Sequence, residues 1–131
     1  MVNQNKNFLS VGVDIEEVNR FSNLDRIQDK NFLDKIFTDR ELDYCFSKDN
    51  PAPHLAGRYV GKEAAVKALS AAGFDKISYR KIEIILDDKG IPEIVMPFDK
   101  VSGKISLSHC EDKALAVVIV TAKNVKKTNK R

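Results

Sequence analysis

Residues 54–72, HLAGRYVGKEAAVKALSAA, are the stretch that decides the fold, because they carry the strongest helical pattern in the chain. Alanine is abundant, and Gly73 follows at the position where a glycine commonly ends a helix. The apolar residues at helical spacing are Leu55, Tyr59, Val66 and Leu69. The stretch therefore predicts a long helix with an apolar stripe.

Shorter elements are expected before this helix. Residues 8–15 form a β-branched apolar run, which predicts a buried strand leading directly into a helix over residues 16–24. Residues 30–37 predict a short helix. Thr38 and Glu41 fit a capping box, so a further helix should begin there.

Beyond Gly73 the apolar period changes from 3.6 to 2, which indicates strands. Residues 82–96 predict a hairpin, residues 97–104 a loop, and residues 105–109 and 114–122 two more strands. The last run is almost continuously apolar and is expected at the centre of the sheet. The predicted fold is α+β, with a long helix and shorter helices packed on a mainly antiparallel sheet.

Length and composition indicate one domain. The chain has 131 residues, 43% of them hydrophobic and 31% charged, and domains commonly hold about 100 to 150 residues. We expect one domain over residues 1–122 and a basic, flexible tail over residues 123–131. The last eleven residues hold five basic residues and no acid, which leaves 17 bases against 19 acids elsewhere. No nucleic-acid partner is expected, because such binding requires a basic face.

Absent signals exclude several classes of protein. No apolar run approaches the roughly 20 residues that cross a bilayer, so no membrane association is expected, and residues 1–7 do not resemble a secretory signal. Cys45 and Cys110 lack metal-binding spacing and read as reduced thiols, which indicates a cytoplasmic protein. The sequence contains no Walker loop, dinucleotide fingerprint, Ser/His/Asp nucleophile motif or HExxH motif.

Polar residues at the ends of two strands are candidates for a site. Asp14 ends the first strand, where a carboxylate is either a helix N-cap or a ligand at the mouth of a cleft. Glu16 shares its face if the strand continues. His109 closes a later strand, where a single histidine is either a core or rim residue or a ligand.

A second group of charged residues lies in the long helix. Glu63 borders the apolar stripe, with Lys62 and Lys67 close by and Arg58 about one turn earlier. Glu63 and Lys67 are either an ordinary surface pair, or Glu63 binds a divalent cation while the bases bind phosphate.

Three motifs follow one another along the chain. They are Gly12-Val13-Asp14-Ile15 with Arg20-Phe21, then Lys62-Glu63-Ala64-Ala65-Val66-Lys67-Ala68-Leu69, then Ile105-Ser106-Leu107-Ser108-His109. Together they resemble the signatures of the holo-acyl-carrier-protein synthases, the small-subunit class of 4′-phosphopantetheinyl transferases, over residues 9–121. One departure is Gly61, where relatives often carry alanine, serine or threonine; it should weaken the helix slightly.

The resemblance implies an activity. Residues 1–122 would be a single catalytic domain that transfers the phosphopantetheine arm of coenzyme A to a serine of apo-acyl carrier protein, in fatty acid biosynthesis. Adenosine 3′,5′-bisphosphate would be released. The resemblance further implies a homotrimer with its sites at subunit interfaces.

The resemblance also implies roles for individual residues. Asp14 and Glu63 would bind Mg²⁺, with Glu16 as a possible third ligand, and the serine's base would be either Glu63 or a water on the metal. The catalytic residues would be Glu63, Asp14 and Lys67. The residues contacting the coenzyme would be Lys62, Lys67 and, from a neighbouring subunit, His109. Arg20 and Arg26, on the first helix, would attract the acidic carrier protein.

Two other functions stay open at this point. One is a coenzyme- or nucleotide-binding module without catalysis, in which lysines bind phosphate and the carboxylates are caps and surface pairs. The other is a small RNA-binding domain led by the basic tail.

Overall fold

The computed structural model describes residues 7–123, so all of the expected tail except Lys123 lies outside the described residues. The elements in chain order are β1 (Leu9–Glu17), the 3-10 helix η1 (Val18–Phe21), α1 (Lys30–Ile36), α2 (Asp39–Phe46), α3 (Pro51–Ala71), the 3-10 helix η2 (Tyr79–Lys81), β2 (Glu83–Leu86), β3 (Pro92–Val95), β4 (Val101–His109) and β5 (Lys113–Ala122).

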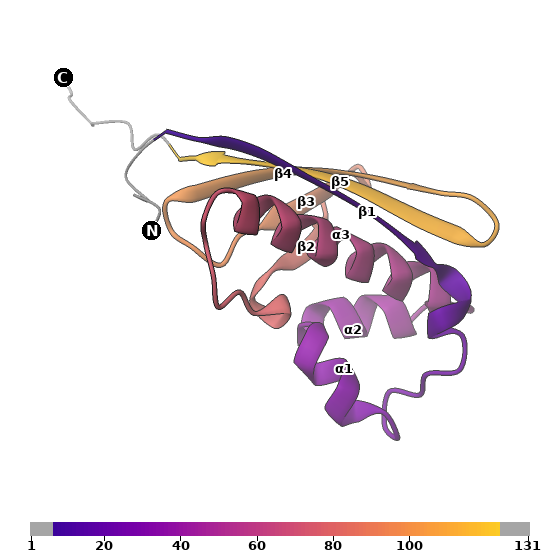
Figure 1. Ribbon diagram of the computed structural model, residues 1–131. Helices are drawn as coiled ribbons and strands as arrows, with labels where there is room; N and C mark the ends of the chain where they lie inside the picture. Colours follow the sequence, from indigo (N-terminus) through magenta and orange to yellow (C-terminus); the bar gives the residue numbers. More distant parts are fainter. Residues whose placement is uncertain (1–6, 124–131) are drawn as a thin grey trace.

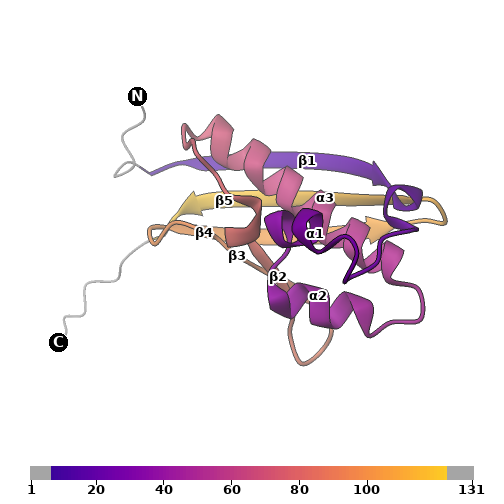
Figure 2. The same cartoon turned by 90° about the horizontal axis from the view of Figure 1, so that it is seen from below.

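The elements form layers around α3. An antiparallel sheet of order β1-β5-β4 lies on one side of α3, and α1 and α2 lie on the other (Figure 1). The hairpin of β2 and β3 forms a separate two-stranded sheet. Seen from below, α3 crosses the three long strands obliquely (Figure 2). This confirms the expected α+β class and the central position of β5.

The long helix is 21 residues in length and starts earlier than its apolar stripe suggested. Asn50 caps it by accepting from the backbone N–H of Ala52 at 3.3 Å, and Pro51 is tolerated because the first helical N–H has no intrahelical partner. Gly73 follows the helix with a φ of 96°, in the left-handed region that glycine adopts without strain. Its position as a C-terminal glycine is thereby confirmed.

The first strand differs from expectation because it is an edge strand and its apolar side chains face away from α3. Leu9, Val11, Val13 and Ile15 are 52–76% exposed, while the small residues Ser10 and Gly12 face the helix. The expectation of a buried strand was therefore wrong. Alternation alone does not tell which face of a strand is covered.

Other helix and strand boundaries differ from the expected ones by a few residues. The helix expected over residues 16–24 is only the four-residue η1, because β1 continues to Glu17 in register with β5. Strand β4 begins at Val101, inside the expected loop, because its first residues pair with the end of β5. Among residues 7–123, no helix is long and apolar enough to cross a membrane.

Candidate active site

The site is built where β1 passes close over α3. A Cβ at Gly12 would overlap the carbonyl oxygen of Ala64 and lie 2.8 Å from the backbone nitrogen of Ala68. The hydroxyl of Ser10, on the same face of the strand, donates to the carbonyl of Ala68 at 2.6 Å. Two small residues thus let the strand backbone approach the helix, and the next residue on this face is Asp14.

Asp14 is bound by a lysine of α3 and does not cap a helix. The ammonium of Lys67 donates to Asp14 Oδ1 at 3.0 Å and to the carbonyl of Val13 at 3.1 Å. The N-cap of η1 is Glu17, which makes no side-chain capping bond. Of the two readings of Asp14 from the sequence, the helix cap is therefore wrong, and its side chain, 17% exposed, lies beside a lysine that is 56% exposed.

Glu63 is held by two tyrosines. The hydroxyl of Tyr59 donates to Glu63 Oε2 at 2.7 Å, and the hydroxyl of Tyr79 donates to Oε1 at 2.8 Å. Burial and the bond to Glu63 raise the pKa of Tyr59 to about 12, and the same causes raise that of Tyr79. Both hydroxyls therefore remain protonated donors at neutral pH. The expected alternative, a surface pair of Glu63 with Lys67, does not form among the described contacts.

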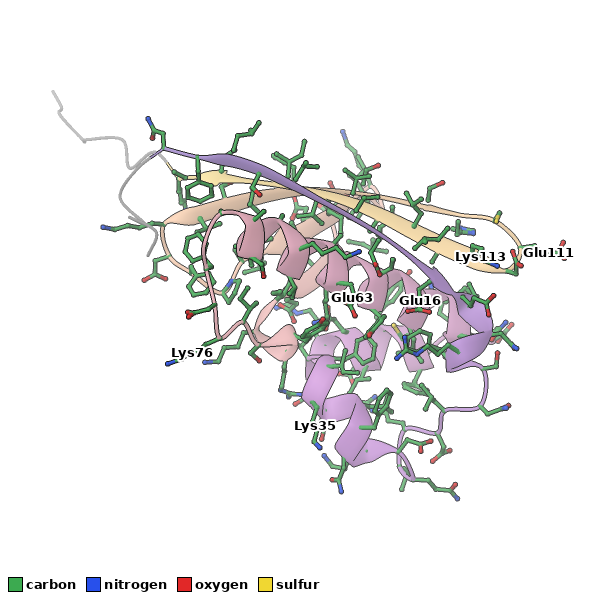
Figure 3. The ribbon with its side chains drawn as sticks, viewed as in Figure 1. Glu16, Lys35, Glu63, Lys76, Glu111 and Lys113 are labelled. Atoms are coloured by element: carbon green, nitrogen blue, oxygen red, sulfur yellow. The ribbon has the colours of Figure 1, made fainter. Side chains whose placement is uncertain are left out.

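Glu16 lies on the same face of β1 but bonds to a different partner. The guanidinium of Arg20 contacts Glu16 Oε2 at 2.7 Å and lies 5.0 Å from the ring centroid of Tyr59. Glu16 and Glu63 lie along the same side of α3 beneath β1 (Figure 3). Within residues 7–123, no three histidine, cysteine or acidic side chains are grouped to bind a metal, and the role of Glu16 as a third ligand stays a prediction.

Lys62 does not lie where a coenzyme ligand should. It is fully buried, forms an ion pair with Glu41 at 2.8 Å and donates to the backbone carbonyls of Tyr79 and Ile82. Burial lowers its pKa, which the charge of Glu41 opposes. The expectation that Lys62 contacts the coenzyme is corrected on this ground, because its ammonium is used inside the core.

A cavity of about 470 Å³ lies between α2, α3 and the β2–β3 hairpin. Arg58 lines it and is 95% buried, yet its Nε has no hydrogen-bond partner among the described residues. Its guanidinium lies 4.4 Å from the ring centroid of Tyr44, which also lines the cavity. Sequence reasoning named Arg58 among the bases near Glu63 that could bind phosphate, but its burial without a partner is not visible in a sequence.

The remaining predicted residues, His109 and Arg26, make no hydrogen bond or ion pair with Glu63 among residues 7–123. His109 is exposed at the end of β4, and no hydrogen bond or ion pair in the described part of the chain joins it to Glu63. Arg26 is not helical; it lies between η1 and α1 and forms an ion pair with Asp43 at 2.6 Å. One chain therefore joins Asp14 to Lys67, one helical turn from Glu63 on α3, whereas no hydrogen bond or ion pair among the described residues joins His109 to any of the three.

The tyrosines that bind Glu63 were missed as site residues. Tyr59 precedes Glu63 by four residues on the same helix, a spacing at which side chains meet, so its role could have been inferred. Tyr79 comes from η2, sixteen residues further along the chain. No local signal links it to Glu63.

Comparison with known proteins places this architecture in a class. The family model described as the 4′-phosphopantetheinyl transferase superfamily matches residues 10–120. That range contains the strand, the long helix and the sheet that form the site.

Comparison with individual proteins narrows this superfamily to one family. The holo-[acyl-carrier-protein] synthase of Thermodesulfovibrio yellowstonii is 39% identical over 111 residues, covering 85% of this chain and 96% of that protein. A crystal structure of the Helicobacter pylori synthase with coenzyme A is 30% identical with a TM-score of 0.70, covering 84% and 98%. The Bacillus anthracis synthase with CoA (3′,5′-ADP) is 27% identical with a TM-score of 0.71, covering 87% and 96%. The chain belongs to the holo-[acyl-carrier-protein] synthase family of this superfamily.

Proposed function

We propose that the protein transfers the 4′-phosphopantetheine group of coenzyme A to a serine of apo-acyl carrier protein. The products are holo-acyl carrier protein and adenosine 3′,5′-bisphosphate, and the reaction serves fatty acid biosynthesis. The observation that carries the proposal is that Lys67 of α3 binds Asp14 of β1, while Glu63, one helical turn earlier on α3, is held by two tyrosines, in a member of this family. A cytoplasmic location agrees with Cys45 and Cys110, which are both free.

The donor chemistry at the site fits Mg²⁺. Asp14 and Glu63 offer hard carboxylate oxygens, and Mg²⁺ is usually bound by one or two carboxylates together with substrate phosphates and water. Each oxygen of Glu63 accepts one tyrosine hydroxyl and retains a second lone pair. When bound, the ion would neutralise charge on the diphosphate of the coenzyme.

Lys67 supplies a positive charge on the same surface. Its ammonium has three donor hydrogens, two of which are accounted for by Asp14 and Val13. The remaining donor and its exposure suit contact with a phosphate oxygen. Lys67 thus orients Asp14 and binds the diphosphate at once, which holds the reacting phosphorus in line with the attacking serine.

The cavity beside Arg58 is suited to the nucleotide end of the coenzyme. Arg58 offers a buried guanidinium with an unused donor, and Tyr44 offers an aromatic surface. Arg40 adds a second positive charge at the wall. Two similar proteins were crystallised with coenzyme A or its 3′,5′-ADP part, and guanidinium groups bind phosphate in bidentate fashion.

The carrier protein is proposed to approach near η1. Arg20 is half exposed and lies at the edge of the site, next to Tyr59. Arg26 follows in the connection to α1. Two positive charges there would steer an acidic partner toward Glu63, although both are already paired with acids in the free protein.

The proposed assembly is a homotrimer. The face of the long sheet opposite α3 presents apolar side chains of β1 and, beside them, Ile119 of β5. A continuous apolar face of this kind marks an association surface. Association would bring His109 of a neighbouring subunit to the coenzyme, and the exposure of His109 at the end of β4 leaves it free for such a contact.

The experiment is incubation with coenzyme A, Mg²⁺ and apo-acyl carrier protein, followed by intact mass measurement of the carrier. We expect the mass to rise by one phosphopantetheine group, and Glu63→Ala to abolish the rise while retaining the fold. Lys81→Met, at an exposed position of η2, is the control and should remain active. Binding of coenzyme A without transfer and without Mg²⁺ dependence would instead identify a binding module.

A further inference from the structure

Both oxygens of one carboxylate are bound by tyrosine hydroxyls from different elements. Tyr59 reaches Glu63 from α3, and Tyr79 reaches it from η2. The two rings are stacked, with centroids 6.1 Å apart and an interplanar angle of 25°. A glutamate has three side-chain torsions, so two bonds at its end restrict an otherwise mobile group.

The backbone that carries Tyr79 is held by the residue before Glu63. The ammonium of Lys62 donates to the carbonyl of Tyr79 at 2.8 Å and also to that of Ile82. Tyr79 is the first residue of η2, and Ile82 lies between η2 and β2. Lys62 and Glu63 are neighbours in sequence, so one turn of α3 fixes both ends of Tyr79, its backbone and its hydroxyl.

Lys62 is itself fixed by a buried acid. Glu41 Oε1 contacts the ammonium at 2.8 Å and accepts the backbone N–H of Thr38 at the same distance. Glu41 Oε2 accepts the backbone N–H of Ile84 at 2.8 Å. The network joins the start of α2, the middle of α3 and strand β2. Buried ion pairs are commonly no more stabilising than apolar packing, so the geometry it imposes is its main effect.

We propose that Tyr79 is a positioning residue for Glu63, acting with Tyr59, and that the buried pair of Lys62 and Glu41 holds Tyr79 within reach. The inference rests on the proposed function, because it concerns the carboxylate assigned there to the reaction. It gives the first lysine of the Lys62-Glu63 motif a role inside the core. It also explains why a lysine next to the site is turned away from it.

The first experiment is Tyr79→Phe, which removes the hydroxyl and keeps the ring. At saturating Mg²⁺ we expect kcat to fall about 10- to 100-fold, the usual effect of removing a partner of a ligand, with the KM for coenzyme A and the melting temperature unchanged. Calorimetry with Mg²⁺ and coenzyme A, without carrier protein, should show weaker binding of Mg²⁺ by a similar factor. Unchanged kcat and unchanged Mg²⁺ binding would overturn the inference. Loss of transfer in the wild type would overturn the proposed function instead.

The second experiment tests the anchor. Lys62→Met should lower kcat, and adding Tyr79→Phe should lower it little further, because both changes release the same carboxylate. Lys81→Met, in η2 itself but exposed, is the matched control and should leave kcat unchanged. If the loss of kcat in the double variant equalled the product of the losses caused by Lys62→Met and Tyr79→Phe separately, the anchoring role would be overturned. Circular dichroism verifies the fold, and should Lys62→Met fail to fold, the Tyr79→Phe result decides alone.

Discussion

Gly12 of β1 and Ala64 of α3 approach so closely that a Cβ on the glycine would overlap the carbonyl oxygen of the alanine. The contact is between two backbones, so neither side can yield by rotating a side chain. It sets how far β1 stands from α3. Asp14 lies two residues further along β1, and its distance from Lys67 depends on the same contact.

Gly12→Ala should therefore separate the strand from the helix. We expect a loss of about 1–3 kcal/mol in the free energy of unfolding, as for other overpacked sites, and a larger loss of kcat because Asp14 moves with β1. Urea unfolding and the mass assay measure the two effects. The control is Gly57→Ala on α3, where an added Cβ meets nothing within 4 Å; it should gain up to about 1 kcal/mol. Equal changes in the free energy of unfolding and in kcat for the two variants would contradict this expectation.

Binding of the two substrates, coenzyme A and the carrier protein, should depend on different arginines. Arg58→Met removes the buried guanidinium of the cavity and should raise the KM for coenzyme A about 10- to 100-fold, since bonds to charged groups contribute about 1.5–3 kcal/mol. Arg26→Met should raise the KM for the carrier protein and leave that for coenzyme A unchanged. Steady-state kinetics with each substrate varied separates the effects. If Arg58→Met changed only the KM for the carrier, the cavity would not be the nucleotide site.

The helices and strands were predictable because their signals are local. The capping box at Thr38 is present as expected, with both reciprocal bonds formed, and Gly73 ends α3 as its position indicated. The side of β1 that packs on α3 was not predictable, since apolar residues lie on the exposed side and small residues on the covered side. Steric fit to the helix outweighed burial of the larger residues.

The site was also predictable only in part, because several of its contacts join residues that are distant in the sequence. Lys62 could not be distinguished from Lys67 by sequence, because its partners are backbone carbonyls 17 and 20 residues away. Gly61 had suggested only a slightly weaker helix. In the structure a Cβ there would overlap Ile84 Cδ1 and lie 2.8 Å from Ile105 Cδ1, so the glycine makes room for β2 and β4.

Assembly should depend on the apolar face of the sheet. Val13→Glu places a charge at a half-exposed apolar position of β1 and should convert the proposed particle of three chains into monomers. Transfer activity should fall with it, because His109 of the neighbouring subunit would be lost from the site. Light scattering after gel filtration measures the mass. Ile91→Glu, at an equally exposed position on the β2–β3 hairpin, should remain trimeric; a monomeric wild type would contradict the proposed assembly.

The free energy of unfolding should fall in mild acid because of His54, which lies at the start of α3. Burial, with the positive charges of Arg58, Lys48 and His109, lowers the pKa of His54 below its ordinary 6.5. The unfolded chain therefore binds this proton more readily than the folded chain as the pH falls below about 6.5. The free energy of unfolding should decrease in that range, and less steeply in His54→Gln. Urea unfolding at pH 5.5 and 7.5 measures both slopes; an identical decrease in the variant would show that carboxylates, shared by both proteins, cause the loss.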